Sequence, residues 1–253
     1  MLHLNCLTWN VHRCRGRDGA VNPDRTQTAL TGLLRARDID LLVLTEADGE
    51  QRPYRSLMDI ERLEKDTGLF SAQQSPSLRW GAESDGFLGT IVLHSERVKL
   101  IDGALLDLPG HYPRGAVILT FERADRGFRV VATHFSLAQV LRVAQMRAIG
   151  QHLDRREDLP TLLIGDLNEW RPWRGLAFAR RVAGRAFAGP ARRSFPAAYP
   201  LLPLDGALAA GGARVLEAAV IRQDDVTAAS DHLPLFARIE ISYGPPSRPG
   251  VHR

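Results

Sequence analysis

The sequence predicts an α/β fold, because short apolar runs of strand length alternate with segments that repeat apolar residues at helical spacing. Residues 41–45 and 161–165 are such runs, and residues 22–34 carry a helical repeat. A chain of 253 residues with 44% hydrophobic content can bury a sizeable core. No linker interrupts residues 1–243, so we expect a single domain there. Residues 244–253 are rich in Pro, Ser and Gly and are expected to form a disordered tail.

The first expected elements follow directly from local sequence signals. Asn22 followed by Pro23 is typical of a helix start, with an N-cap and a proline at the first helical position. The elements on either side of this helix are a strand at 4–10, a Gly- and Arg-rich loop at 13–19, a strand at 40–45 and a helix near 54–65.

The middle of the chain predicts antiparallel strands and then an amphipathic helix. Segments with strand-like apolar content are expected to form a meander: 87–94, 98–106, 116–121 and 128–133. The helix begins at Ser136, and its predicted sheet-facing residues are Leu137, Val140, Leu141, Ala144, Ala148 and Ile149. The later expected elements are a strand at 161–165, a helix near 173–182 and strands at 205–209, 215–221 and 235–241.

The charge of the chain is compatible with an anionic substrate or surface. The formal net charge is +4 and the pI is about 9.5, and Lys65 and Lys99 are the only lysines. An arginine-favouring genomic base composition explains this bias equally well. The N-terminus does not resemble a secretory signal, and no apolar run reaches a membrane-spanning length. We therefore expect a cytoplasmic protein, with Cys6 and Cys14 as free thiols rather than a disulfide.

Polar side chains recur at the ends of the expected strands. A strand fixes the position of the residue that ends it, while the following loop leaves that residue open to solvent. Such positions are suited to bring ligands together in one pocket. They are occupied by Asn10, Glu46, His134, Asp166 with Asn168, and Asp205, and a distant segment adds Ser230-Asp231-His232.

Taken in order, these motifs resemble the endonuclease/exonuclease/phosphatase superfamily, whose members include deoxyribonuclease-like, abasic-site endonuclease, sphingomyelinase and inositol-phosphate phosphatase enzymes. The matching motifs are Trp9-Asn10, Glu46, Thr133-His134, Gly165-Asp166-Leu167-Asn168, Leu204-Asp205 and Ser230-Asp231-His232. The stretch 194–205 looks most like that of small bacterial members of unassigned substrate. The resemblance implies a four-layer sandwich of two packed mixed β-sheets with helices on the outside.

The resemblance also implies a divalent metal, Mg²⁺ with Mn²⁺ as a substitute. Mg²⁺ prefers a few carboxylates and retains waters, so Glu46 is the first expected ligand. Asn10 is expected beside it as an amide ligand or organiser, and Asp231 as a ligand of the metal or its water network. Taken alone, Glu46 would be interpreted as a solvated acid at a strand end and Asn10 as a turn residue.

The remaining motif residues are expected to carry the chemistry. By resemblance, Asp166 orients or deprotonates the attacking water, and Asn168 donates to the phosphate or the leaving oxygen. His232 is expected at the scissile phosphate as a general base or protonated donor, with Asp205 orienting its ring. His134 is expected to bind phosphate or protonate the leaving group. In isolation, Gly-Asp-x-Asn is more often an Asx turn that closes a strand, and a lone histidine is more often structural.

Arginines are candidate substrate contacts. Arg114 precedes a strand, and Arg142 with Gln145 resembles the family's Arg-x-x-Gln helix. The basic, aromatic-containing stretch within 171–193 could contact a nucleic-acid backbone or an anionic membrane. An amphipathic helix with a solvated arginine face is the simpler interpretation.

Some positions depart from the family pattern and weaken any transfer of a specific substrate. Thr90 stands where many relatives carry an asparagine, Thr45 where they carry a glutamine before the metal-binding acid, and His12 where an acid is common. The phosphate-hydrolysing set itself is intact.

The sequence therefore predicts a Mg²⁺-dependent phosphoesterase, most readily a monomeric phosphodiesterase that cleaves nucleic acid. The first alternative is a phospholipid or small-molecule phosphoester hydrolase, resembling a sphingomyelinase or a phosphatase. The second is a non-catalytic binding module on the same scaffold, and the retention of Glu46, Asp166, Asn168, Asp231 and His232 argues against it.

Overall fold

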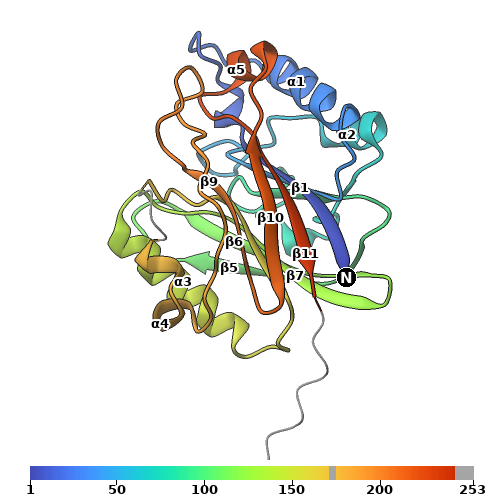
Figure 1. Cartoon of the computed structure of the whole chain (residues 1–253). Coiled ribbons are helices and arrows are strands. Elements are labelled where there is room, and N and C mark those ends of the chain that lie inside the picture. The colour runs from blue at the N-terminus through green and yellow to red at the C-terminus, as the bar shows by residue number, and fades with distance from the viewer. Residues whose placement is uncertain (171–174, 243–253) are drawn as a thin grey trace, which may run out of the picture.

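The computed structural model describes residues 1–170 and 175–242 and shows two mixed β-sheets with helices outside them (Figure 1). The predicted tail at 244–253 lies outside the described residues, as do the first two positions of the helix predicted near 173–182. None of the helices in the described residues combines the length and apolar character that a membrane crossing requires.

One sheet has six strands in the order β10-β11-β1-β2-β4-β3. Its β1 and β2 are parallel, with Cys6 opposite Leu41 and Asn10 opposite Thr45, and the other neighbours are antiparallel. The strands are β1 Leu2–Asn10, β2 Leu41–Thr45, β3 Phe70–Ser71, β4 Ile91–His94, β10 Ala213–Val220 and β11 Leu235–Ile241.

The other sheet has five strands in the order β5-β6-β7-β8-β9. Its β7 and β8 are parallel, with His134 opposite Asp166, and β9 runs antiparallel to β8, with Asp205 opposite Asp166. The strands are β5 Lys99–Leu108, β6 Arg114–Arg123, β7 Arg126–His134, β8 Thr161–Asp166 and β9 Asp205–Ala210.

The helices cover the outer faces of both sheets, so the four-layer sandwich expected from the resemblance is confirmed. An inner apolar cluster joins the two sheets through side chains such as Cys6, Val43, Val130 and Ile164. Two outer clusters attach the helices. The helices are α1 Pro23–Arg35, α2 Ile60–Thr67 and α5 Asp224–Ala229 over the first sheet, with α3 Gln139–Leu153 and α4 Arg180–Ala183 over the second; short 3-10 turns are η1 His12–Cys14, η2 Pro76–Leu78 and η3 Leu176–Phe178.

Three predicted elements differ in the structure. The strand predicted at 87–94 is shorter, β4, and it pairs with β2 in the six-stranded sheet instead of joining the meander. The helix predicted near 54–65 begins only at Ile60, where the Asp59 side chain accepts from Arg62 N–H and caps it. The helix predicted near 173–182 is, in its described part, the turn η3 followed by the short helix α4.

The buried face of α3 also differs from the predicted one. Leu137, before the helix, is 66% exposed and Val140 is 80% exposed. The buried residues of α3 are Arg142, Gln145, Met146, Ile149, Gly150 and Leu153; of the predicted residues, Ile149 is buried and Ala148 is partly buried against the same apolar cluster. Two polar residues belong to this face because they hydrogen-bond backbone carbonyls, which an apolar repeat does not reveal.

Both cysteines are free and buried, as the sequence indicated. Burial raises the pKa of the Cys6 thiol and raises that of Cys14 to about 11. Cys6 packs in the inner cluster between the sheets as a small apolar side chain.

Candidate active site

Strand alternation places four of the predicted polar residues between the two sheets. Side chains two positions apart in a strand face the same way, and Val130 and Ala132 of β7 and Ile164 of β8 belong to the inner cluster. His134 and Asp166 continue these inward rows at the strand ends. Asn10 continues the inward row of β1 after Cys6, and Asp205 begins that of β9 before Ala207.

Asn10 connects the ends of both sheets. Its side-chain Nδ2 donates to Asp166 Oδ2 at 2.9 Å and lies 3.5 Å from Glu46 Oε1. Its side-chain oxygen accepts from His12 N–H at 2.9 Å. Of the two roles expected for Asn10, this geometry favours the organiser, because the amide oxygen that a metal would use is already hydrogen-bonded.

Glu46 reaches the same place by an unusual backbone conformation. Alternation would direct this residue to the helix-covered face, but its φ of +53° is left-handed and redirects the side chain. Its Oε1 lies 3.9 Å from His134 Nδ1, and His134 Nε2 lies 3.3 Å from Asp166 Oδ2. Glu46 and Asp166 therefore share two neighbours, Asn10 and His134, and belong to one site.

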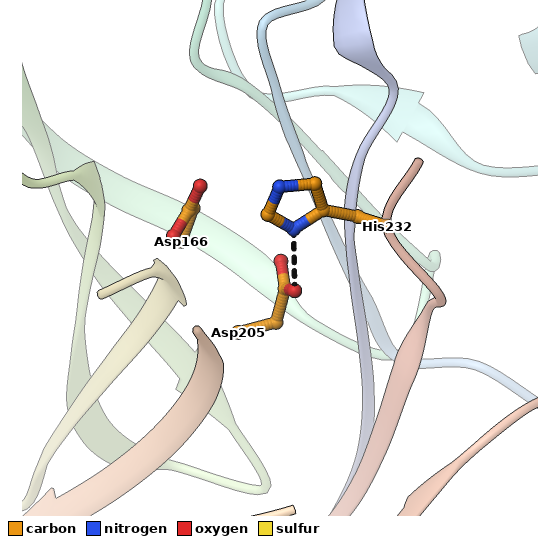
Figure 2. A group of neighbouring side chains, drawn as sticks. All are labelled: Asp166, Asp205 and His232. Atoms are coloured by element: carbon orange, nitrogen blue, oxygen red, sulfur yellow. Dashed lines mark hydrogen bonds and ion pairs between the residues drawn. The ribbon is translucent and has the colours of Figure 1, made fainter. Parts of the chain in front are cut away.

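His232 and Asp205 form a buried pair beside Asp166 (Figure 2). His232 Nδ1 lies 2.8 Å from Asp205 Oδ2, which also accepts from Ser194 Oγ at 2.6 Å. The Phe195 ring packs against the imidazole with centroids 4.8 Å apart. These contacts fix the ring and leave its Nε2 as the nitrogen that can face a substrate.

The loop that carries His232 is tied to β1. Ser230 Oγ donates to Asn10 O at 2.8 Å, and Trp9 Nε1 donates to His232 O at 2.9 Å. The end of β1 thus positions both the amide of the site and its imidazole, although the two lie far apart in the sequence.

The two histidines have opposite electrostatic environments. Burial alone would lower the pKa of His232, but the charge and hydrogen bond of Asp205, with Asp166 and Asp231, outweigh it and raise this pKa to about 10. Burial lowers the pKa of His134 well below its ordinary value, and the positive charges of Arg114 and His232 lower it further. At neutral pH the site therefore pairs a cationic His232 with a neutral His134.

Asp166 has the raised pKa expected of a buried carboxyl group. Burial is the largest cause, the negative charges of Asp205 and Glu46 add to it, and the charge of His232 opposes it, giving a pKa of about 7. A carboxylate with a pKa near the working pH is well suited to accept a proton.

The donor set of the site fits a hard divalent cation. In the described residues, Asp166, Asp205 and His232 offer ligand atoms within 4.8 Å of one another. The Oδ1 atoms of Asp205 and Asp231 are buried and accept no hydrogen bond. Carboxylate oxygens are the donors that Mg²⁺ prefers, and of these two oxygens only that of Asp231 has a nitrogen of the described residues nearby, His12 Nδ1. His232 is the weakest of these candidate ligands, because its Nδ1 is engaged with Asp205.

Asp231 and Asn168 lie at the edges of the site. Asp231 Oδ1 is 3.2 Å from His12 Nδ1. Asn168 has a left-handed φ of +49°, its N–H donates to Asp166 Oδ1 at 3.1 Å, and its Nδ2 donates to Phe135 O at 2.8 Å. The Asx turn is confirmed by the hydrogen bond to Asp166, and the expected donation from Asn168 to the phosphate or leaving oxygen stays a prediction.

Arg114 lies beside the site, whereas Arg142 does not. A pocket of about 480 Å³ adjoins Glu46 and His134, and its lining includes Arg13, Arg114 and Tyr112. Arg142 is fully buried, and its guanidinium donates to Ser136 O and Leu137 O and lies 3.4 Å from Glu169 Oε1. The expectation that Arg142 contacts substrate is thus wrong for this structure, since the guanidinium serves the polypeptide itself.

We therefore expect Arg142→Gln to destabilise the fold rather than weaken substrate binding. The substitution removes the guanidinium that donates to the buried carbonyls of Ser136 and Leu137, and the loss of these charge-assisted hydrogen bonds costs about 3 kcal/mol. Urea unfolding measures this loss, and KM measured below the unfolding range should stay within about twofold of the wild type. If the unfolding free energy were unchanged and KM were raised, Arg142 would be a substrate contact.

The basic stretch proposed within 171–193 is only partly described. Arg185 contacts Asp154 at 3.3 Å and Asp158 at 3.0 Å, next to the end of α3. Phe178 is buried, while Trp170 is 48% exposed. Arg185 is thus directed to the protein's own carboxylates.

The comparisons with known proteins agree with this geometry. The sequence model of the Endonuclease/Exonuclease/phosphatase family matches residues 7–232. The chain belongs to this family. Among curated proteins, the sequence search finds no match.

Several solved structures share the fold. A protein of this family from Beutenbergia cavernae is 21% identical, with a TM-score of 0.67 over 98% of this chain and 74% of that one. D. rerio TDP2, complexed with a single-strand DNA product, is 15% identical, with a TM-score of 0.68 over 95% and 100% of the two chains. The human Nocturnin catalytic domain, with a bound sulfate anion, is 19% identical, with a TM-score of 0.67 over 95% of each chain. The chain is a phosphoesterase of the endonuclease/exonuclease/phosphatase family.

Sequence reasoning missed two side chains of this family site. Ser194 holds Asp205, and Arg13 donates to Glu46 Oε2 at 2.6 Å. Ser194 lies in a stretch that resembles small bacterial family members, but nothing in that stretch indicates its partner. The sequence indicates only a loop for the Arg-rich segment after β1. No sequence pattern predicts which partner an arginine side chain on a turn will contact.

Proposed function

We propose that the protein is a Mg²⁺-dependent phosphodiesterase that hydrolyses nucleic-acid phosphodiester bonds by in-line attack of water. The observation that carries this proposal is the convergence of Asp166, Asp205 and His232 within 4.8 Å of one another, next to Glu46 through shared neighbours. A non-catalytic binding module has no use for a buried carboxylate whose pKa is raised beside an oriented imidazole.

Glu46 and Asp231, with Asp166 nearby, would hold the metal, and Asn10 would position Glu46 and Asp166. A bound Mg²⁺ supplies positive charge that stabilises the phosphoryl oxygens and the leaving oxygen. The Oδ1 atom of Asp205, which is buried and has no hydrogen-bond partner, supports cationic charge beside these residues.

The proton transfers fall to the protein's own side chains. Asp166 takes a proton from water as the water oxygen bonds to phosphorus. The bond to the leaving oxygen breaks, and that oxygen leaves with the electron pair and takes a proton from solvent. His232, cationic and oriented by Asp205, donates a hydrogen bond to the phosphoryl group through Nε2. Of the roles expected for His134, its lowered pKa favours phosphate binding as a neutral donor over protonation of the leaving group.

A nucleic-acid substrate is supported by the basic character of the chain, with a formal net charge of +4, and by the arginines near the site. The alternative, a phospholipid or small phosphoester, is supported by exposed apolar side chains that line the adjacent pocket: Tyr112 is 72% exposed and Leu137 is 66% exposed. A membrane surface would accept such side chains.

The deciding experiment compares substrates on one preparation of the protein. Oligonucleotides, plasmid, phospholipid vesicles and small phosphomonoesters and phosphodiesters are assayed with Mg²⁺, with Asp166→Ala and His232→Ala as controls. Cleavage of oligonucleotides by the wild type alone supports the proposal. Hydrolysis restricted to lipid headgroups selects the alternative, and no hydrolysis of any substrate would overturn the enzyme assignment.

Metal removal is expected to lower activity by at least about 10²-fold, because the charge developing on the phosphoryl group loses its main counter-charge. EDTA treatment followed by dialysis measures this loss, and Mg²⁺ or Mn²⁺ should restore the rate. Glu46→Gln should fail to recover at metal concentrations that saturate the wild type. Full activity in EDTA would contradict the metal assignment.

A further inference from the structure

The turn that follows β1 has an unusual backbone. His12, Arg13 and Cys14 have φ angles of +48°, +49° and +58°, a run of left-handed residues that contains no glycine. Each such residue costs about 1–2 kcal/mol, so surrounding contacts must impose the conformation. Strain of this kind is concentrated at functional sites.

Backbone hydrogen bonds fix this turn against the end of β2. Val11 N–H donates to Thr45 O at 3.0 Å, and Arg13 N–H donates to Glu46 O at 3.0 Å. The main chains of Arg13 and Glu46 are thereby held together, so their side chains can change partners without movement of the backbone.

The side chains of the turn lie on the carboxylates proposed to hold the metal. Arg13 donates to Glu46 Oε2 at 2.6 Å and its other terminal nitrogen lies 3.7 Å from Glu50, while His12 lies 3.2 Å from Asp231. Glu46 Oε1 faces Asn10 and His134 while Oε2 accepts from Arg13, so a divalent ion that takes both carboxylate oxygens must displace the guanidinium. Arg13 is therefore a competitor for Glu46 that belongs to the chain itself.

Arg13 is also placed to meet a substrate. With Arg114 and His134 it lines the pocket beside Glu46, its side chain is 30% exposed, and its Nε is buried without a hydrogen-bond partner. A planar guanidinium released from a carboxylate suits phosphate oxygens, which offer the same fork of acceptors.

We propose that Arg13 exchanges partners during the reaction cycle: it holds Glu46 until a divalent ion takes that carboxylate, and it then binds a phosphate of the substrate. This inference rests on the proposed function, since it requires that Glu46 binds the metal. Metal binding would thus deliver a second cation to the substrate and couple the two binding steps.

Mn²⁺ binding to the substrate-free protein, followed by electron paramagnetic resonance, tests the first half. Arg13→Gln is expected to tighten Mn²⁺ binding about fivefold, because the competitor is removed. Arg114→Gln is the matched control: it removes a charge that acts on the same site without an ion pair to Glu46 within 4.0 Å, so its effect should be smaller. An equal effect of both variants, or unchanged or weaker Mn²⁺ binding in Arg13→Gln, would overturn the proposal.

Inorganic phosphate tests the second half. Its affinity for the Mn²⁺-loaded protein is expected to fall about tenfold in Arg13→Gln, the loss of a charge-assisted contact. Unchanged phosphate affinity would overturn the exchange. Glu46→Gln separates this inference from the proposed function: if Glu46→Gln binds Mn²⁺ as the wild type does, the metal assignment fails, whereas a failure confined to Arg13→Gln leaves that assignment standing.

Discussion

Asp166→Asn is expected to lower kcat by about 10³-fold while leaving the fold in place, because the substitution removes the proposed general base. The amide oxygen can accept from Asn168 N–H, as Oδ1 does at 3.1 Å in the wild type, while the hydrogen bond from Asn10 Nδ2 to Oδ2 is lost. The new amide cannot take a proton from water. Single-turnover kinetics with saturating Mg²⁺ measure the chemical step separately from substrate binding.

The matched control is Asp40→Asn. Asp40 is also a buried carboxylate, but it accepts from Asn5 N–H, within β1 and away from Asn10, and pairs with Arg97 at 2.8 Å. The Asp40→Asn variant should have a lower free energy of unfolding and an unchanged kcat per folded molecule. If Asp166→Asn retained more than about a tenth of the wild-type kcat, Asp166 would not be the base.

Asp205→Asn is expected to lower kcat on the order of 10³-fold and to reduce the pKa of His232. In the wild type this pKa is raised from 6.5 to about 10, with Asp205 as the largest favourable cause. Without that charge, the ring should lose its proton at a lower pH. The basic limb of the pH–rate profile should therefore shift to lower pH.

The same shift links His232 to stability. Because the folded-state pKa lies above the unfolded value, protonation of His232 stabilises the folded protein. This contribution is complete below pH 6.5 and is lost as the pH rises through about 10. Asp205→Asn should therefore flatten the fall in unfolding free energy over this range.

NMR titration of the imidazole resonances measures the pKa directly. The control is Asp102→Asn, an exposed acid paired with Arg156 at 2.7 Å, which should leave both the resonance and the rate unchanged. A His232 resonance that titrates near 6.5 in the wild type would contradict the proposed cationic role.

The sequence predicted the residues at the strand ends because two simple regularities act together. Apolar runs identify the strands, and the period of two then sets which residue at each end continues the inward row. Asn10, His134, Asp166 and Asp205 all follow this rule. Gly165 shows the close packing behind it: its φ is +141°, and a Cβ there would lie 2.0 Å from Thr133 O on the neighbouring strand.

Other features could not be read from the chain because they depend on contacts between distant segments. The apolar repeat after Ser136 indicates only part of the buried face of α3, since Arg142 and Gln145 are buried through hydrogen bonds to the carbonyls of Ser136 and Pro109. The sheet to which β4 belongs is set by its pairing with β2, which strand composition does not encode. The sequence identifies Glu46 only as an acid at a strand end. Its left-handed backbone, which turns the side chain toward the site, does not follow from the alternation of side chains in a strand.

The arrangement of the two sheets has a consequence for how activity arises during folding. Asn10, Glu46 and His232 belong to the half of the sandwich built on β1, β2 and β11, whereas His134, Asp166 and Asp205 belong to the half built on β7, β8 and β9. Neither half contains all the residues of the active site. Catalytic turnover therefore requires that the two halves pack correctly against each other. A chain with well-formed strands but misaligned sheets would be inactive.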